Sequence, residues 1–221
     1  MSRPTVLPTS ESSRKGFALS KRKKNLAIAS SALTAGAVLT WKLKSLKSLF
    51  GIRTAKGAEY LSEFKEGAFE IRLYSAHAVA EVTISGERDT AVSEGFRALF
   101  QYISGRNESG TEFQMTSPVS QVKVDGGWQS SFFLPTSVDL AHLPHSSDPR
   151  VRVFAVPSRR CAFLTFSGKS GPIEFAYQSR RLQNWIRNHG WTPEAAPTLD
   201  LYDPPFTLPY FKKNAVQIEL G

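Results

Sequence analysis

Residues 69–86, FEIRLYSAHAVAEVTISG, and residues 151–168, VRVFAVPSRRCAFLTFSG, share one pattern. Aligned without a gap, they are identical at four positions: Ala80/Ala162, Thr83/Thr165, Ser85/Ser167 and Gly86/Gly168. Each stretch alternates apolar and polar residues on both sides of a bend, which is typical of two short strands. A helical pattern, a Pro-marked turn and a final apolar strand follow each copy. The sequence therefore predicts a βαββ unit that occurs twice, over about residues 68–135 and 150–221.

Both repeats contain an amphipathic helix. In the first repeat, Thr90 can cap a helix that runs to about Ser104. Its apolar positions recur at helical spacing and are Val92, Phe96, Leu99 and Ile103, with Phe100 beside them. In the second repeat, Pro172 suits a first helical turn and Gly190 suits the end. We expect the apolar side of each helix to face the core. A ligand wall formed by Phe96 and Phe100 is the second interpretation.

The basic charge of the chain is confined to its first part. Residues 1–57 contain twelve Lys and Arg and one acid, whereas residues 58–221 contain sixteen Lys and Arg against eighteen Asp and Glu. A folded domain that grips phosphates needs its cations on the domain itself. The charge distribution therefore argues against a nucleic-acid partner.

Residues 1–57 form a basic tail that carries a hydrophobic segment. Residues 25–41 contain no charge, and as a helix they would span about 25 Å of a hydrocarbon core of about 30 Å. Residues 41–52 interleave Lys with Leu and Phe, which indicates an amphipathic helix at an anionic lipid surface. We therefore expect the tail to precede a single domain at residues 58–221.

Three interpretations of this tail stay open. A single N-terminal membrane helix fits the seven cations before residue 25 and the five after residue 41. A cleaved signal peptide fits the basic start and the small residues from Ala35 to Ala37. An organelle transit peptide fits the basic, Ser-rich and acid-poor composition. We expect membrane association through one helix, with export or organelle import after cleavage as the alternative.

Several motifs of the folded part, taken in order, resemble the SOUL haem-binding family. They are FEIRLY, FxxLFxYISGxN from Phe96 to Asn107, MTSPV from Met115 to Val119, FFLP at 132–135, and the terminal YDPP and KKNAVQIEL. The likeness covers about residues 58–221. It implies an α+β fold in which duplicated βαββ units form two antiparallel sheets in an open, distorted barrel, with a helix on each half. It also implies reversible, non-covalent binding of haem or a related tetrapyrrole, for haem buffering or transport.

The resemblance suggests how haem would be held. Some members place a proposed axial His where this chain has Leu73. Another branch holds the porphyrin in an apolar groove beside the first helix, with basic residues where Ser93 and Gln101 stand here. This chain looks nearer to the groove-binding branch.

A porphyrin requires a flat apolar slot and cations for its propionates. Candidates for the slot are Phe96, Phe100, Met115, Tyr210 and Phe211, and candidates for the cations are Lys212, Lys213 and Arg72. His77, at the bend of the first copy, is a candidate iron ligand, although a solvated turn residue is the favoured interpretation. The spacing of His142 and His145 is too weak to predict a metal site.

The sequence favours a binding protein over an enzyme. It contains no Ser-His-Asp order, phosphate-binding Gly loop or Cys cluster. Two alternatives remain, because a fold does not determine function. One is an enzyme that acts on a small hydrophobic ligand in the same groove, with Glu70, Tyr74, Tyr102 or Tyr202 as titratable groups. The other is a protein-interaction domain without a ligand.

Overall fold

The structure is a computed structural model that describes residues 55–204 and 206–221. In these residues nine strands form one antiparallel sheet, accompanied by two α-helices and a short 3-10 helix, η1 (Pro209–Phe211). The helices are α2 (Arg88–Ile103) and α3 (Pro172–Asn188). The strands are β1 (Tyr60–Glu66), β2 (Phe69–Tyr74), β3 (His77–Ile84), β4 (Val119–Val124), β5 (Gly127–Phe133), β6 (Val151–Val156), β7 (Arg159–Ser167), β8 (Thr198–Leu201) and β9 (Lys213–Leu220).

The strands pair in a pattern that repeats between the two halves. The sheet order is β1-β2-β7-β9-β8-β4-β5-β3-β6, so that β3-β5-β4 in the first half matches β7-β9-β8 in the second. The pairing of β2 with β7 matches that of β6 with β3. The strand pairing thus has the pseudo-twofold symmetry expected of two βαββ units.

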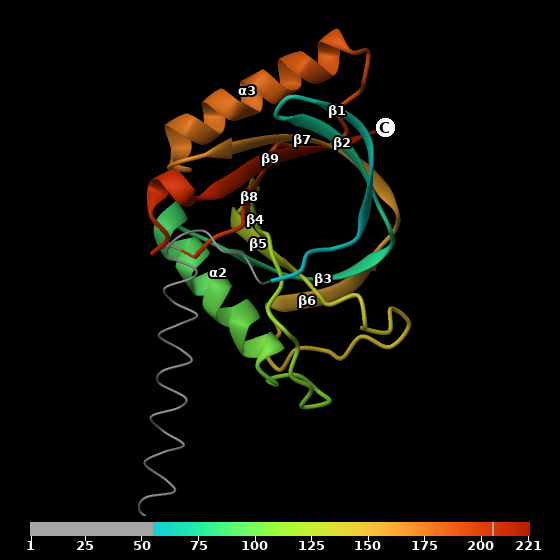
Figure 1. Ribbon diagram of the computed structural model, residues 1–221. Helices are drawn as coiled ribbons and strands as arrows, with labels where there is room; N and C mark the ends of the chain where they lie inside the picture. The colour runs from blue at the N-terminus through green and yellow to red at the C-terminus, as the bar shows by residue number, and fades with distance from the viewer. Residues whose placement is uncertain (1–54, 205) are drawn as a thin grey trace, which may run out of the picture. The chain divides into compact units, whose positions relative to one another are not determined.

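The prediction of an α+β fold with an open barrel of antiparallel strands is confirmed, but the prediction of two separate sheets is wrong. β4 pairs with β8 and joins the two halves into one continuous sheet. The pairing gives each strand a partner at what would otherwise be an exposed edge. Figure 1 shows this sheet curled into an open half-barrel, with α2 and α3 on its outside.

Alternation along the strands separates the two faces of the sheet. On β3, the residues from Ala78 to Ile84 at even positions pack with α2, whereas Val79 and Glu81 face the inside of the curl. On β7, Ala162, Leu164 and Phe166 pack against α3 in the same way. Each helix therefore seals one half of the convex face, and the concave face is left for other groups.

Both helices are close to their predicted positions. α2 begins at Arg88, two residues before the predicted cap Thr90. Glu87 has an extended backbone and is the N-cap, and Asp89 lies in the first turn, where the helix dipole favours an acid. α3 begins at Pro172, as predicted. Gly190 follows α3 with a φ of 76°, in the left-handed region that glycine adopts readily.

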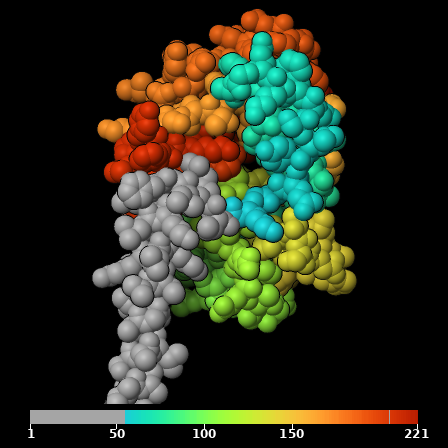
Figure 2. Space-filling model, viewed as in Figure 1, coloured from blue at the N-terminus to red at the C-terminus, as the bar shows by residue number. Residues whose placement is uncertain are grey.

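β1 is an edge strand that attaches the start of the described chain to α3. Phe64 lies 6.0 Å from the ring of Trp185, and the indole Nε1 of Trp185 donates to Glu66 Oε2 at 2.5 Å. In Figure 2 the cyan residues of β1 accordingly lie beside the orange residues of α3. These contacts hold β1 against the second half of the molecule.

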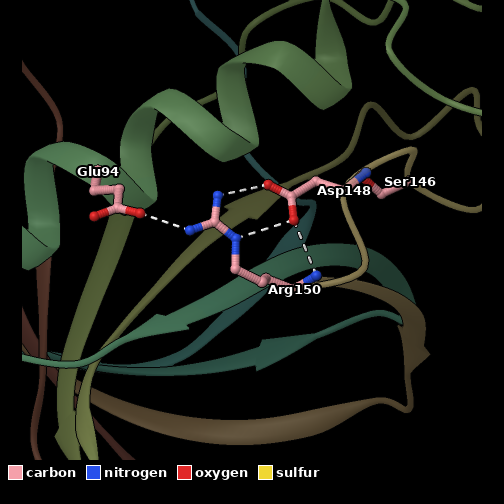
Figure 3. A network of polar contacts seen from close by, with 4 residues as sticks. All are labelled: Glu94, Ser146, Asp148 and Arg150. Carbon is pink, nitrogen blue, oxygen red and sulfur yellow. Dashed lines mark hydrogen bonds and ion pairs between the residues drawn. The ribbon is translucent and has the colours of Figure 1, made fainter.

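A polar network fixes the long loop between the halves to α2. Arg150 donates from Nε and Nη2 to the carboxylate of Asp148, at 3.0 and 2.8 Å, and from Nη1 to Glu94 Oε1 at 2.6 Å (Figure 3). Ser146 Oγ accepts the backbone N–H of Asp148 at 3.1 Å. One guanidinium thus connects the loop to the helix of the first half.

The predicted tail features lie outside the described residues: the hydrophobic segment at 25–41 and the amphipathic segment at 41–52. Within residues 55–204 and 206–221, neither helix has the length and apolar character needed to cross a bilayer.

Candidate ligand-binding site

Seven large apolar side chains near one end of the sheet are substantially exposed. They form what we call the α2–loop surface: Phe96, Phe100, Met115, Phe206, Leu208, Tyr210 and Phe211. Five of the seven are aromatic, and the exposed fraction reaches 86% for Tyr210. Apolar side chains that gather on a surface in this way often mark a binding site.

Strand register connects the parts of this surface. Phe132 on β5 faces Val119 on β4, which faces Leu201 on β8. The Phe96 ring meets Phe132 edge-on at 5.4 Å, and the loop of residues 202–212 begins directly after Leu201. With about 4.8 Å between neighbouring strands, Phe132 and Leu201 lie about 10 Å apart, so Phe96 and the start of the loop are near the same end of the sheet.

Met115 belongs to the same end of the sheet. The next residue, Thr116, donates its hydroxyl to the carbonyl oxygen of Phe133, which is the last residue of β5. Phe96 and Phe100 stack with their centroids 6.2 Å apart, and Tyr210 and Phe211 meet edge-on at 5.8 Å. Phe96 and Phe100 therefore form one aromatic pair beside β5, with Met115 close to the end of that strand. Tyr210 and Phe211 form a second pair in η1, which contacts β7.

Two of the three predicted cations adjoin this surface. Lys212 follows η1 directly, and Lys213 begins β9. Lys213 Nζ lies 4.5 Å from the centre of the Tyr202 ring, and its backbone N–H donates to Asp203 Oδ2 at 2.7 Å. Lys212 and Lys213 are therefore held at the base of the loop that carries Tyr210.

Arg72, the third predicted cation, lies on the concave face and away from that surface. Its Nε donates to Glu70 Oε2 at 2.8 Å, and its guanidinium lies 4.4 and 4.1 Å from the ring centres of Tyr60 and Phe163. Burial opposes the charge of Arg72, yet Tyr202 and Glu70 raise the pKa of its guanidinium. Arg72 is thus the centre of a buried polar cluster.

Three of the four titratable groups considered for catalysis surround Arg72. Glu70 is its ion-pair partner, Tyr202 accepts from its Nη1 at 3.4 Å, and Tyr74 lies on the same strand. Burial raises the pKa values of Tyr74 and Tyr202, so both phenols remain protonated at neutral pH. Burial opposes ionisation of Glu70, but hydrogen bonds and the charge of Arg72 outweigh it and lower its pKa.

Tyr102 is separate from this cluster. It lies on the buried side of α2, and its hydroxyl donates to the carbonyl oxygen of Pro144 at 3.1 Å. Burial raises the pKa of Tyr102 to about 12. Its hydrogen bond holds the inter-repeat loop against the first helix, which is a structural role.

Asp200 is a buried acid that the sequence analysis did not single out. Its Oδ1 accepts from Ser120 Oγ at 2.6 Å and from Gln217 Nε2 at 3.0 Å. Its Oδ2 has no hydrogen-bond partner among the described residues. Burial raises the pKa of Asp200 to about 7, although both hydrogen bonds oppose this effect.

The interpretation of His77 as a solvated turn residue is wrong, because the side chain is buried between Tyr74 and Phe133. Its Nδ1 lies 2.7 Å from the carbonyl oxygen of Ser75, and burial lowers its pKa. Over residues 55–204 and 206–221, no group of three His, Cys, Asp or Glu side chains is arranged to hold a metal ion. His142 lies 2.8 Å from Asp139 at an exposed position.

The concave face also contains a cavity of about 280 Å³. Strands from both halves contribute to its walls, so the cavity lies between the two repeats. The lining residues used below are Val79, Glu81, Gln129, Phe133, Phe154, Val156, Arg159, Cys161 and Glu219. Alternation along the strands predicts that these side chains point inward. The sequence has no local signal for the β4–β8 pairing, however, and this pairing determines which strands face one another across the cavity.

Solved structures show a similar fold at low sequence identity. The C-terminal domain of EcmrR matches with a TM-score of 0.52 and 9% identity, over 73% of this chain and 98% of that one. A hydrolase from Listeria innocua matches with a TM-score of 0.49 and 12% identity, over 72% of this chain and 94% of that one. At such identities the likeness to EcmrR concerns the fold alone. No curated protein sequence shows a significant match to this chain.

The sequence motifs and the symmetric strand pairing agree with one family. The family model of the SOUL heme-binding protein matches residues 56–219, which is nearly all of the described chain. This chain belongs to the SOUL heme-binding protein family.

Proposed function

We propose that this protein binds haem, or a related tetrapyrrole, non-covalently on the α2–loop surface and thereby buffers or carries it. Membership of a haem-binding family supports the ligand class. The observation that carries the location is the set of seven exposed apolar side chains on α2, just before β4 and in the loop of residues 202–212. A macrocycle that covers them would remove apolar surface from water, at about 25 cal/mol for each Å².

A bound macrocycle would meet aromatic rings. Phe96 and Phe100 already stack with an interplanar angle of 10°, so their ring planes are nearly parallel. Lys212 and Lys213 would pair with the propionates, because an ammonium group close to a carboxylate forms a charge-assisted hydrogen bond. His77 has no part in this site, since it is buried on the concave face.

Titration of the purified full chain with haemin tests the proposal. We expect a shifted Soret band that saturates near one equivalent of haemin. A spectrum that stays unshifted, or an absorbance that rises without saturation, would show that the surface does not form a specific site.

We also propose that the protein is attached to a membrane through residues 25–41. The proposal rests on the uncharged composition of this segment and on the cations that flank it. Fractionation of cells that express the full chain, followed by a carbonate wash, should leave the protein in the membrane pellet. Mass spectrometry of its N-terminus distinguishes a retained anchor, which begins before residue 25, from a cleaved signal or transit peptide.

A further inference from the structure

The cavity on the concave face is separate from the α2–loop surface and differs from it in chemistry. Its volume of about 280 Å³ lies just below the range of ligand pockets, which is roughly 300–1,000 Å³. It therefore suits a molecule much smaller than a tetrapyrrole. Val79, Phe133 and Val156 give it an apolar wall.

The charged groups of the cavity wall are two carboxylates and one guanidinium. Arg159 Nη1 donates to Glu219 Oε2 at 2.9 Å, so these two groups neutralise each other. Glu81 is the remaining carboxylate. Among the side chains that line the cavity, only Gln129 bonds to it in the described structure, and this amide donates to Glu81 Oε2 at 2.6 Å.

The cation that balances Glu81 reaches it from outside the cavity wall. Arg152 lies opposite Glu81 in the register of β6 and β3, and its Nη2 forms an ion pair with Glu81 Oε1. The side chain of Arg152 is 74% exposed, whereas that of Glu81 is only 8% exposed. A buried carboxylate is thus neutralised by an arginine that remains largely in solvent.

The guanidinium of Arg152 also lies 5.8 Å from the centre of the Phe154 ring, which lines the cavity. A carboxylate and an aromatic face together are the groups that recognise organic cations. Arg152 therefore occupies a position that has the chemistry of a cation-binding site.

We infer that the concave cavity binds a small organic cation with an apolar body, and that this cation displaces Arg152 from Glu81 and Phe154. The side chain of Arg152 is already 74% exposed, so its own release into solvent costs little. A buried carboxylate left without a cation is costly, so the departing guanidinium has to be replaced by another positive group. The apolar body of the ligand would then contact Val79, Phe133 and Val156.

Binding of benzylguanidinium to the full chain tests this inference, because the probe combines a guanidinium with a phenyl ring. Titrations followed by amide chemical shifts should give saturable changes at residues of β3 and β6. In Arg152→Ala the competing side chain is absent, so we expect the dissociation constant to fall about tenfold, which equals about 1.4 kcal/mol. In Glu81→Gln the saturable changes should disappear.

Benzylurea, which has nearly the same shape but no charge, is the control that requires no substitution. It should not bind to the wild-type chain or to Arg152→Ala. Saturable binding of benzylurea equal to that of benzylguanidinium, an unchanged dissociation constant in Glu81→Gln, or no saturable shifts in Arg152→Ala would each overturn the inference.

This site is independent of the proposed haem site. Haemin titrations of Arg152→Ala and Glu81→Gln should match that of the wild-type chain, and benzylguanidinium should bind equally well in the presence of haemin. Competition between the two probes would show that they share one surface, and would also overturn the inference.

Discussion

Ser120 and Asp200 face each other across the β4–β8 pairing, and Ser120 Oγ donates to Asp200 Oδ1 at 2.6 Å. These two strands are the ones that join the halves of the sheet. The junction between the repeats therefore contains a carboxyl group that is only 1% exposed. Because Asp200 Oδ2 has no partner among the described residues, its ionisation bears directly on the stability of this junction.

Asp200 should make the protein less stable as the pH rises from about 4 to about 7. Its pKa is raised to about 7 in the folded state, against 3.8 for the ordinary group. Between these values the folded chain binds the proton and the unfolded chain does not, so the folded state is favoured most at the acidic end. Relative to Asp200→Asn, which cannot ionise, the wild-type free energy of unfolding should fall by on the order of 4 kcal/mol across this range.

Urea unfolding of both proteins at pH values from 4 to 8 measures this difference. Other groups with shifted pKa values, such as His77 and Glu70, are present in both proteins and cancel. A constant difference between the two unfolding free energies over the whole range would contradict the assignment to Asp200.

Arg72 should be essential for stability only while Glu70 is charged. Replacing Arg72 by Met leaves a buried carboxylate without its cation, which typically costs about 3–5 kcal/mol. The double variant Arg72→Met with Glu70→Gln should recover most of that loss. Chemical denaturation of the single and double variants measures it, and Arg160→Met, which breaks an exposed pair with Glu63, should have a much smaller effect. Equal losses in the single and double variants would show that packing, rather than charge, is the reason.

The exposed rings of α2 should be required for haem binding and not for folding. Because Phe96 and Phe100 are 38% and 48% exposed, replacing both by Ser should weaken haemin binding at least tenfold while the melting temperature changes little. The matched control is the pair Ile173 and Tyr177, which has the same spacing and is exposed on α3. If both double variants weaken haemin binding equally, the site does not lie on α2.

Arg150 should hold the inter-repeat loop closed against proteolysis. Replacing Arg150 by Ala removes its bonds to Asp148 and Glu94, so thermolysin should cleave at Leu140 or Leu143 several times faster. Arg97→Ala, on the exposed side of α2, should leave this rate unchanged. Because the Arg150 pairs lie at the surface, we expect the unfolding midpoint to change little. An unchanged cleavage rate in Arg150→Ala would show that other contacts close the loop.

Alternation and helical spacing predicted the repeat, the two helices and the residues that face them. The same spacing placed Phe96 in the core, yet the buried side of α2 is centred on small residues such as Ala91, Gly95 and Ala98. A Cβ at Gly95 would lie 3.1 Å from Ser130 Oγ, so the helix lies very close to the sheet. This close approach turns Phe96 and Phe100 toward solvent, which hydrophobicity alone does not predict.

The arrangement of side chains on the concave face depends on contacts between residues that are distant in the sequence. Alternation along β2 places Glu70, Arg72 and Tyr74 on one side, but it does not show that Tyr202 completes their cluster. Arg72 was predicted as a candidate cation for the haem propionates, and arginine side chains are seldom fully buried. The pairing of β2 with β7 and of β4 with β8 buries it instead.

The cavity lies between two repeats that have diverged in chemistry. Val79 and Cys161 occupy equivalent positions in the ungapped alignment, and both line it. Two residues further along, the first repeat has Glu81 and the second has Phe163. A ligand between two identical halves could bind in either of two reversed orientations with equal energy. Glu81 lines the cavity, whereas Phe163 is fully buried next to the Arg72 guanidinium and does not line it. The two reversed orientations therefore differ in energy, and a cationic ligand has a single preferred direction.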